Sequence, residues 1–128
     1  MRARSSLVIC LSLLACGGCG KKQKSTAELI ADLKGTEERD RLIAVRLLPE
    51  HQNDAAQVVP ALIEALGDKA VDIRLSAAIG LGSLGEQAKD AVPALKAAQK
   101  DRDARVRGAA GVALARIDPD SAPKSPSR

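Results

Sequence analysis

Two cysteines stand close enough in this sequence to act together. Cys16 and Cys19 form a CxxC pair, and Cys10 precedes them. In redox enzymes such a pair exchanges thiols for a disulfide, within a fold where strands alternate with helices. No such alternation flanks this pair, so we do not expect redox catalysis.

The only histidine, His51, lies between two acidic residues, Glu50 and Asp54. A metal site would need a second histidine or a usable cysteine nearby, and neither is present. The chain has no Phe, Tyr or Trp, which excludes base stacking and aromatic cages. It also lacks a Ser, His and acid set and a phosphate-binding loop. We therefore expect no enzyme, no metal and no cofactor, and a partly packed or surface His51.

Arginine and aspartate recur at a fixed spacing and could form ionic bonds. Arg41, Arg74 and Arg107 follow one another at a constant interval, and Asp68 and Asp101 precede the last two by six residues. The arginines could bind an anion, but we favour a structural ladder in which each turn carboxylate bonds an arginine. Gly35 replaces the aspartate in the first unit, where Arg41 must find another acceptor or remain available.

These residues belong to a 33-residue internal repeat. Val59-Pro60-Ala61-Leu62 aligns with Val92-Pro93-Ala94-Leu95 without a gap, and the same step backward matches Leu29, Arg41, Ala44 and Leu48. Three copies predict a stacked array, in which each unit buries its apolar face against its neighbours.

Within each unit the apolar spacing is helical. The second unit predicts one helix marked by Val59, Leu62, Ile63 and Leu66, and another marked by Ile73, Ala77, Leu81 and Leu84. Helix starts are expected at Pro60, at Pro93 and at the capping-box pair Ser25 and Glu28, a helix end at Pro49, and turns at Gly67-Asp68 and Lys100-Asp101. The predicted fold is all-α, a short α-solenoid of about three helix pairs.

The repeats share a Val-Arg-like pair followed by alanine and a Leu-Gly-like pair: Ile73-Arg74, Ala77, Leu81-Gly82, then Val106-Arg107, Ala110, Leu114-Ala115. In this the chain resembles HEAT-repeat proteins over residues 26 to 118, particularly the short repeats named after phycobilisome lyases. The first repeat departs, with Asp40 before Arg41 and Pro49 after Leu48. The resemblance implies that the arginine–aspartate ladder is structural and that the second helices line a concave face.

That concave face is the expected partner site. At 100° per residue, Leu75 and Ile79 lie nearly opposite the buried stripe that starts at Ile73. With their repeat equivalents they predict an apolar strip, bordered by Arg39, Arg46, Arg105 and Arg116, that suits an acidic peptide or helix. We assign partner binding to Leu42, Arg46, Asp72, Leu75, Ile79, Arg105, Val112 and Arg116. Packing of Leu75 and Ile79 against an adjacent repeat remains an open alternative.

Four glycines fall within the predicted second helices: Gly80, Gly82, Gly108 and Gly111. Each costs about 1 kcal/mol relative to alanine, so we expect close helix approach there and modest stability. In the third unit Lys96 and Gln99 replace apolar residues, which predicts that the array ends after three units.

The N-terminus carries a targeting pattern. Arg2 and Arg4 precede an apolar stretch from Leu7 to Ala15, which is shorter than the roughly 18 residues of a spanning helix. Leu13-Leu14-Ala15-Cys16 resembles the lipobox of bacterial lipoproteins, which implies lipidation of Cys16 and leaves Cys19 as a lone thiol. An incidental cysteine in an ordinary secreted protein is the alternative. Gly17 after the lipidated cysteine favours outer-membrane sorting where two membranes exist.

The expected organisation is a signal peptide at 1–15, a flexible basic tether at 16–24, a repeat domain at 25–118 and a disordered tail at 119–128. Removing Arg2 and Arg4 lowers the 20 basic residues to 18, against 16 acidic ones. Because this balance is nearly even and the compartment is wrong, we expect no nucleic-acid binding.

The leading hypothesis is a monomeric, lipid-anchored adaptor or scaffold in the bacterial cell envelope, facing the periplasm or exterior. It would hold a protein or peptide on the concave face without catalysis. The alternatives are a lyase-like or chaperone-like factor, as the resemblance to phycobilisome lyases implies, and a module that only stabilises a larger envelope assembly.

Overall fold

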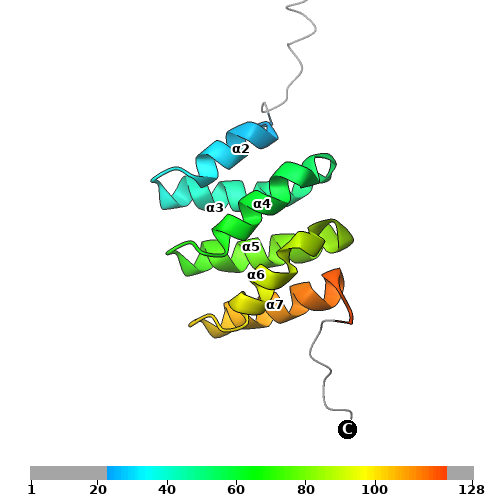
Figure 1. Cartoon of the computed structure of the whole chain (residues 1–128). Helices are drawn as coiled ribbons and strands as arrows, with labels where there is room; N and C mark the ends of the chain where they lie inside the picture. Colours follow the sequence, from blue (N-terminus) through cyan, green and yellow to red (C-terminus); the bar gives the residue numbers. More distant parts are fainter. Residues whose placement is uncertain (1–22, 121–128) are drawn as a thin grey trace, which may run out of the picture.

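The computed structural model of the chain describes residues 23–120, and within that range it contains helices and no strands. The α-helices form three consecutive pairs (Figure 1): α2 (Thr26–Leu33) with α3 (Glu38–Leu47), α4 (Ala55–Ala65) with α5 (Val71–Leu84), and α6 (Val92–Ala98) with α7 (Ala104–Ile117). Short 3₁₀ segments connect the pairs at Leu48–Glu50, Gln52–Asp54 and Gly85–Ala91. The predicted all-α stack of three helix pairs is confirmed.

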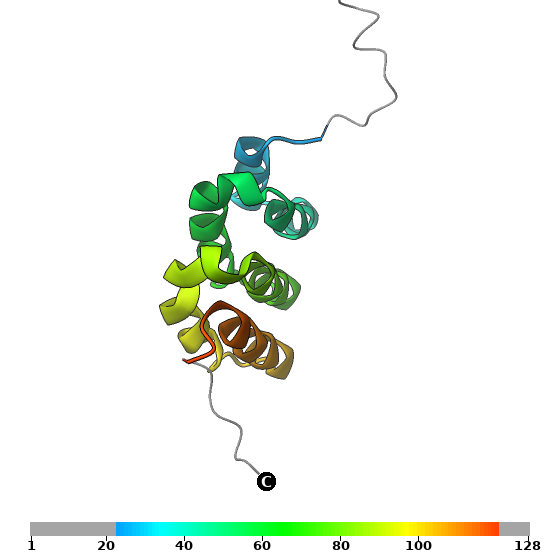
Figure 2. The same ribbon diagram turned by 90° about the vertical axis from the view of Figure 1, so that its right-hand side faces the viewer.

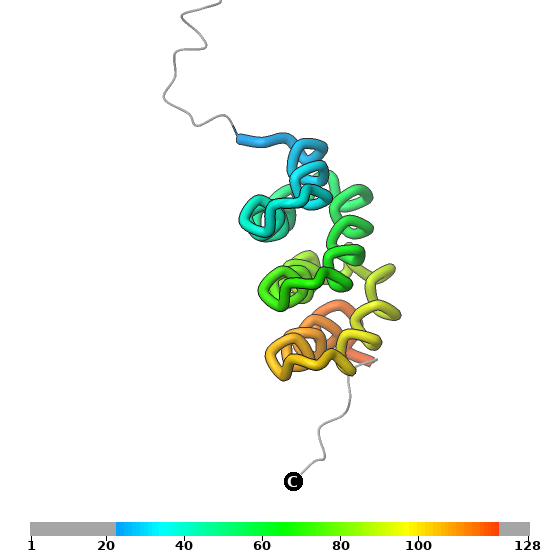
Figure 3. Tube along the Cα trace, turned by 90° about the vertical axis from the view of Figure 1, so that its left-hand side faces the viewer, coloured from blue at the N-terminus to red at the C-terminus, as the bar shows by residue number. Residues whose placement is uncertain are grey.

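The helices lie in two layers. Figures 2 and 3, taken from opposite sides, both show α2, α4 and α6 in one layer and α3, α5 and α7 in the other. The second helices contact one another more extensively than the first helices do, above all where α5 packs along α7. Closer spacing in one layer curves a stack toward that layer, so the second helices line the inner face.

The core is aliphatic and repeats with the sequence. Residues at the same position of successive units are fully buried, as the periodicity predicts, and they include Leu29, Leu62 and Leu95; Ile73 and Val106; Ala44, Ala77 and Ala110; and Leu48, Leu81 and Leu114. Each unit therefore buries its apolar residues within its own pair and against the adjacent pairs, which is the arrangement expected of a repeat array.

Most of the predicted helix boundaries are confirmed. Ser25 and Glu28 form a capping box at the start of α2, Pro49 follows α3 in a 3₁₀ turn, and Pro93 lies in the first turn of α6. The prediction for Pro60 is wrong, because this residue lies inside α4. The turn at Gln52–Asp54 leads directly into helix at Ala55, and the exposed proline removes only one backbone hydrogen bond from it.

Two of the four helical glycines mark close approach. A Cβ added at Gly82 of α5 would lie 3.0 Å from the Cα of Ala113 on α7, and one added at Gly80 would lie 2.7 Å from Pro49 Cγ. The same expectation is wrong for Gly108, which faces open space. At Gly111 a Cβ would make only an ordinary contact with the Gln99 side chain. The glycines that permit close approach therefore lie on α5 and not on α7.

Some of the predictions concern residues outside the described range. The signal peptide, Cys16, most of the basic tether and most of the C-terminal tail fall within residues 1–22 and 121–128. Within residues 23–120 no helix combines the length and the apolar character that crossing a bilayer requires.

Candidate functional site

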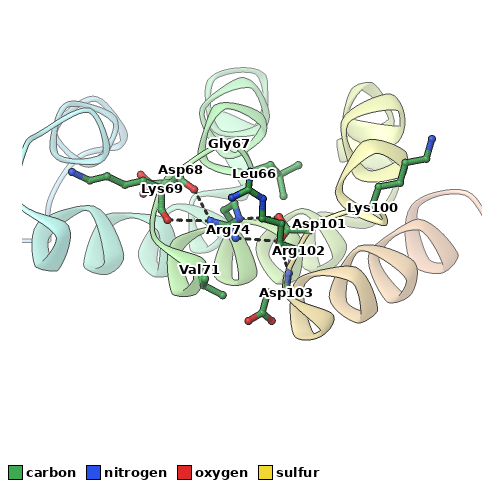
Figure 4. A pocket seen from close by; sticks show the side chains of 10 residues that line it. All are labelled: Leu66, Gly67, Asp68, Lys69, Val71, Arg74, Lys100, Asp101, Arg102 and Asp103. Carbon is green, nitrogen blue, oxygen red and sulfur yellow. Dashed lines mark hydrogen bonds and ion pairs between the residues drawn. The ribbon is translucent and has the colours of Figure 1, made fainter.

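The arginine–aspartate ladder lies at the turns that join the helices of each pair. Arg74, near the start of α5, donates from Nε to Asp101 Oδ2 at 2.8 Å and from Nη2 to Asp101 Oδ1 at 3.1 Å. Its Nη1 donates to the backbone oxygens of Asp68 and Lys69 at 2.9 and 3.1 Å. Arg74 thus joins the turn of its own unit to the carboxylate of the next (Figure 4).

The first unit uses the same geometry. Arg41 is buried and donates from Nε to Asp68 Oδ2 at 2.9 Å, while its Nη1 donates to the backbone oxygens of Gly35 and Thr36 at 3.2 and 2.7 Å. We expected each carboxylate to meet the arginine that follows it in the same unit, and that pairing is wrong. Each aspartate instead bonds the arginine of the preceding unit, because the guanidinium fork points into the gap between stacked turns. Arg41 therefore has a carboxylate partner although its own turn carries glycine.

Within residues 23–120, no further helix pair follows the last arginine of the series. Arg107 is exposed, and its Nη1 donates to the backbone oxygens of Asp101 and Arg102 at 2.9 and 3.0 Å. Among residues 23–120 no carboxylate forms an ion pair with it. Arg107 thus keeps the backbone contacts of Arg41 and Arg74 but lacks the ionic bond between units.

The ladder changes the protonation equilibria of its members. The hydrogen bond from Arg74, followed by one from the backbone N–H of Asp103, lowers the pKa of Asp101 below its ordinary value of 3.8. The same bond to Asp101 raises the pKa of Arg74. Both groups stay charged at neutral pH, so the pair joins the second and third units as a charge-assisted, bidentate contact.

An open cleft of about 790 Å³ lies over these turns (Figure 4). Its central polar side chains are already engaged, because Arg74 and Asp101 bond each other and Asp101 also accepts from a backbone N–H, while the exposed Lys69, Lys100 and Arg102 lie at its edge. Within the described residues no group of three His, Cys, Asp or Glu side chains could hold a metal ion. The cleft is therefore an interface between two units rather than a prepared ligand site.

The inner face of the second helices offers a more apolar surface. A hollow of about 370 Å³ between α3 and α5 is lined by Val45, Arg46, Pro49, Leu75, Ser76, Ile79, Gly80 and Ser83. A second hollow, of about 280 Å³ between α5 and α7, is lined by Ala78, Ile79, Gly82, Ala109, Val112, Ala113 and Arg116. Ile79 contributes to both linings, so the two hollows lie side by side across α5.

The two open interpretations of the apolar strip can now be separated. Ile79 and Val112 are 55% and 54% exposed, whereas Leu75 is half-buried and packs against the core. Arg46 and Arg116 are exposed and each lines one hollow. Of the eight residues assigned to partner binding, the structure thus gathers five around the hollows: Arg46, Leu75, Ile79, Val112 and Arg116.

The other three lie elsewhere. Leu42 is half-buried against the core. Asp72 and Arg105 are exposed near the starts of α5 and α7, with 3.7 Å between Asp72 Oδ1 and Arg105 Nη1. Arg105 also bonds Asp103 at 3.2 Å, which lowers the pKa of Asp103. These three residues line neither hollow.

A hydrogen-bonded cluster that sequence reasoning missed involves His51. The buried hydroxyl of Thr26 donates to the Asp54 carboxylate and lies 3.0 Å from His51 Nδ1. A hydroxyl carries one hydrogen, so Nδ1 must be the donor in the second contact. We expected a partly packed or surface His51, and the structure shows it partly packed. Thr26 lies at the start of α2, 25 residues before His51, and this pairing gave no signal in the repeat pattern.

Comparison with known proteins adds one match. A family model described as HEAT repeats matches residues 26–115, which covers all three helix pairs except the last two residues of α7. No curated protein matches the chain significantly.

Proposed function

The chain belongs to the HEAT-repeat family, and from this premise we propose that it is a non-enzymatic adaptor that holds a protein segment across its second helices. HEAT-repeat domains generally serve as scaffolds for protein interaction. The proposed binding surface consists of the two hollows on either side of Ile79, and we call it the inner groove.

The observation that carries the proposal is the exposure of Ile79 between two hollows. A large aliphatic side chain that is 55% exposed gains free energy when a partner covers it, and the adjoining hollows can receive apolar side chains. Val112 extends the same surface onto α7. The inner groove therefore suits a partner segment with apolar residues on one face.

The charges around the inner groove indicate the rest of the partner's chemistry. Arg46 lines one hollow and Arg116 the other, and neither lining contains an aspartate or glutamate. A partner segment with acidic residues on both sides of its apolar ones would place a carboxylate near each arginine. Charge complementarity of this kind favours the correct register and faster association.

For localisation we retain the lipid anchor as part of the proposal. Lipidation of Cys16 would tether the repeats to a membrane of the bacterial envelope through the glycine- and lysine-rich segment that follows. Its test is metabolic labelling with palmitate. The wild-type chain should take up label and sediment with membranes, and Cys16→Ser should do neither. A labelled Cys16→Ser chain would contradict this assignment.

The groove itself is tested by site-specific photo-crosslinking in cells, with the photoreactive residue at Arg116. The chain is compared with and without Ile79→Glu. Loss of one buried isoleucine contact is worth about 1.5–3 kcal/mol, so crosslinking to the main partner should fall roughly tenfold to a hundredfold.

Ile43→Glu is the matched control. Ile43 is 43% exposed on α3 and lines neither hollow, so the same substitution there should leave crosslinking unchanged. Equal crosslinking by the wild-type and Ile79→Glu chains, or an equal loss in both variants, would contradict the proposed surface.

A further inference from the structure

Arg107 is held ready for a carboxylate that the described chain does not supply. In all three units the arginine Nη1 donates to two backbone oxygens of its own turn. This fixes the guanidinium, so that Nε and Nη2 of Arg41 and Arg74 reach the aspartate of the next unit. Arg107 has the same two backbone contacts and, within residues 23–120, no carboxylate in front of its fork.

The surface beside Arg107 corresponds to one that is packed elsewhere in the array. Gly82 of α5 lies against Ala113 of α7, and its equivalent one unit later, Ala115, is exposed. Gly108, next to Arg107, faces open space. We call Arg107, Gly108, Gly111 and Ala115 the terminal face. It is a helix side with small residues that permit close approach of another helix, together with one oriented cation.

We propose that the terminal face docks a helix pair of another polypeptide, which carries an aspartate in the turn between its two helices. This interface is separate from the inner groove and does not depend on the proposed adaptor function. Docking would extend the stack along α7, not along α6, whose end carries the polar Lys96 and Gln99, and it would give Arg107 the bidentate bond that Arg74 already makes.

The two ladder aspartates define what the partner must present. Asp101 Oδ1 accepts the backbone N–H of Asp103 at 2.9 Å, and Asp68 Oδ1 accepts that of Ala70 at the same distance. These bonds hold each carboxylate in the turn just before a second helix. A partner aspartate held in the same way would be preorganised toward Arg107, and charge-assisted bonds of this kind are among the stronger hydrogen bonds in proteins.

A second copy of this chain does not fit in the same register. Its first unit has Gly35 where the ladder requires aspartate, and the Gly35 oxygen already accepts from Arg41. The segment 121–128 is also unsuited, because it contains Lys124 and Arg128 but no aspartate or glutamate. Neither a second copy in this register nor residues 121–128 thus supplies the turn aspartate that the ladder geometry requires.

The test adds a further helix pair, with an aspartate in its turn, to the full chain by covalent extension. A second copy of residues 85–117 is inserted directly after Ile117, so that a copy of Asp101 follows Arg107 at the same separation at which Asp101 follows Arg74. The matched control carries asparagine at that copied aspartate. Two readouts are compared, the NMR resonance of the Arg107 Nε–H and the midpoint of thermal unfolding.

We expect the aspartate copy to shift the Arg107 resonance and to unfold at a midpoint at least about 5 °C above the asparagine copy, as loss of a charge-assisted bond predicts for a small domain. An unshifted resonance with equal midpoints would overturn the proposal. Ile79→Glu, added to both extended chains, should change neither the difference in the Arg107 resonance nor the difference in the unfolding midpoint between them. This separates failure of the terminal-face proposal from failure of the inner-groove proposal.

Sedimentation velocity of the original chain tests whether a second copy of this chain occupies the terminal face. We expect monomers for both wild type and Arg107→Gln. Self-association that Arg107→Gln abolishes would assign the terminal face to a second copy and overturn the proposed partner.

Discussion

Replacing Arg74 with glutamine removes the central bond between the second and third units. The guanidinium makes two hydrogen bonds to Asp101 and two to backbone oxygens of its own turn. In the variant the Asp101 carboxylate keeps only the hydrogen bond from the Asp103 N–H among these contacts. The variant therefore leaves a poorly compensated charge between two packed turns.

The expected loss in the free energy of unfolding follows from how deeply the Arg74–Asp101 pair is buried. The Arg74 and Asp101 side chains are 14% and 11% exposed. Removing one partner of a fully buried pair costs about 3–5 kcal/mol, whereas a surface pair is worth about 0–1 kcal/mol. We expect a loss of about 2–3 kcal/mol, which lowers the unfolding midpoint of a domain of this size by roughly 10–20 °C.

Arg107→Gln is the control, because it makes the same change at the same position of the next unit. Arg107 is exposed and has only the two backbone contacts, so we expect it to lose less than about 1 kcal/mol. The assay is thermal unfolding followed by circular dichroism, at one salt concentration and neutral pH. The double variant Arg74→Gln/Asp101→Asn should be more stable than Arg74→Gln alone, since asparagine carries no charge to leave unpaired.

An equal fall of the midpoint in Arg74→Gln and Arg107→Gln would refute this expectation. Equal losses would mean that the bonds to the turn carbonyls, which both arginines share, account for the effect. A loss in the double variant equal to the sum of its single losses would likewise show that the two side chains do not interact.

Three further predictions concern other parts of the molecule. Gly82→Leu should destabilise the fold by about 1–3 kcal/mol or more because α7 blocks the side chain, whereas Gly108→Leu should stabilise it by up to about 1 kcal/mol through helix propensity; urea unfolding measures both. The pKa of Asp101 is lower in the folded state, so stability should fall as pH drops below about 4, and Asp101→Asn should flatten that dependence in acid-unfolding curves. Neutral His51 should carry its proton on Nδ1, as nitrogen NMR of the ring would report, and Thr26→Val should remove that preference.

Each of these has a clear contrary result. Stabilisation by Gly82→Leu would show that α5 and α7 can separate without loss. An Asp101→Asn variant as sensitive to acid as wild type would place the responsible carboxylate elsewhere. A dominant Nε2–H form of the neutral His51 ring would contradict the direction of the hydrogen bond from His51 to Thr26.

The fold could be predicted because it depends on short-range periodicity. The units align without a gap, and residues such as Leu62 and Leu95 are buried for the same local reason. The error at Pro60 has a local origin too. A proline at a predicted helix start gives no information on whether the preceding residues already form a turn of helix, and here Ala55–Val59 do.

The sequence predicted which residues take part in the ladder, but not which aspartate bonds which arginine. Sequence spacing placed Asp68 and Asp101 shortly before an arginine of their own unit, but side-chain direction selects the arginine of the preceding unit. The contacts of Thr26 with His51 and Asp54 join the start of α2 to the 3₁₀ turns that follow α3. Both kinds of contact depend on how helices pack in space, and residue spacing along the sequence does not specify that.

The inner groove could be predicted from the sequence only in part. Helical geometry correctly placed Ile79 opposite the buried stripe, but it did not show whether a neighbouring helix covers that position. Exposure depends on how closely α3 and α7 approach α5. Gly82 permits close approach of α7 at Ala113, and Gly80 lies against Pro49, just after α3, and Leu62 of α4. Val112 is exposed for the same reason, since α7 meets α5 through Ala113 instead.

The unequal contacts between the second helices also give the array a direction of mechanical weakness. α3 packs on α5 less extensively than α5 packs on α7. Tension between Lys24 and the third helix pair would therefore separate the first helix pair from the second before the second separates from the third. That separation would remove Val45, Arg46 and Pro49 from one wall of the groove. Tension on the N-terminal side would therefore release a partner segment bound in the proposed inner groove, while α5 and α7 stayed packed together.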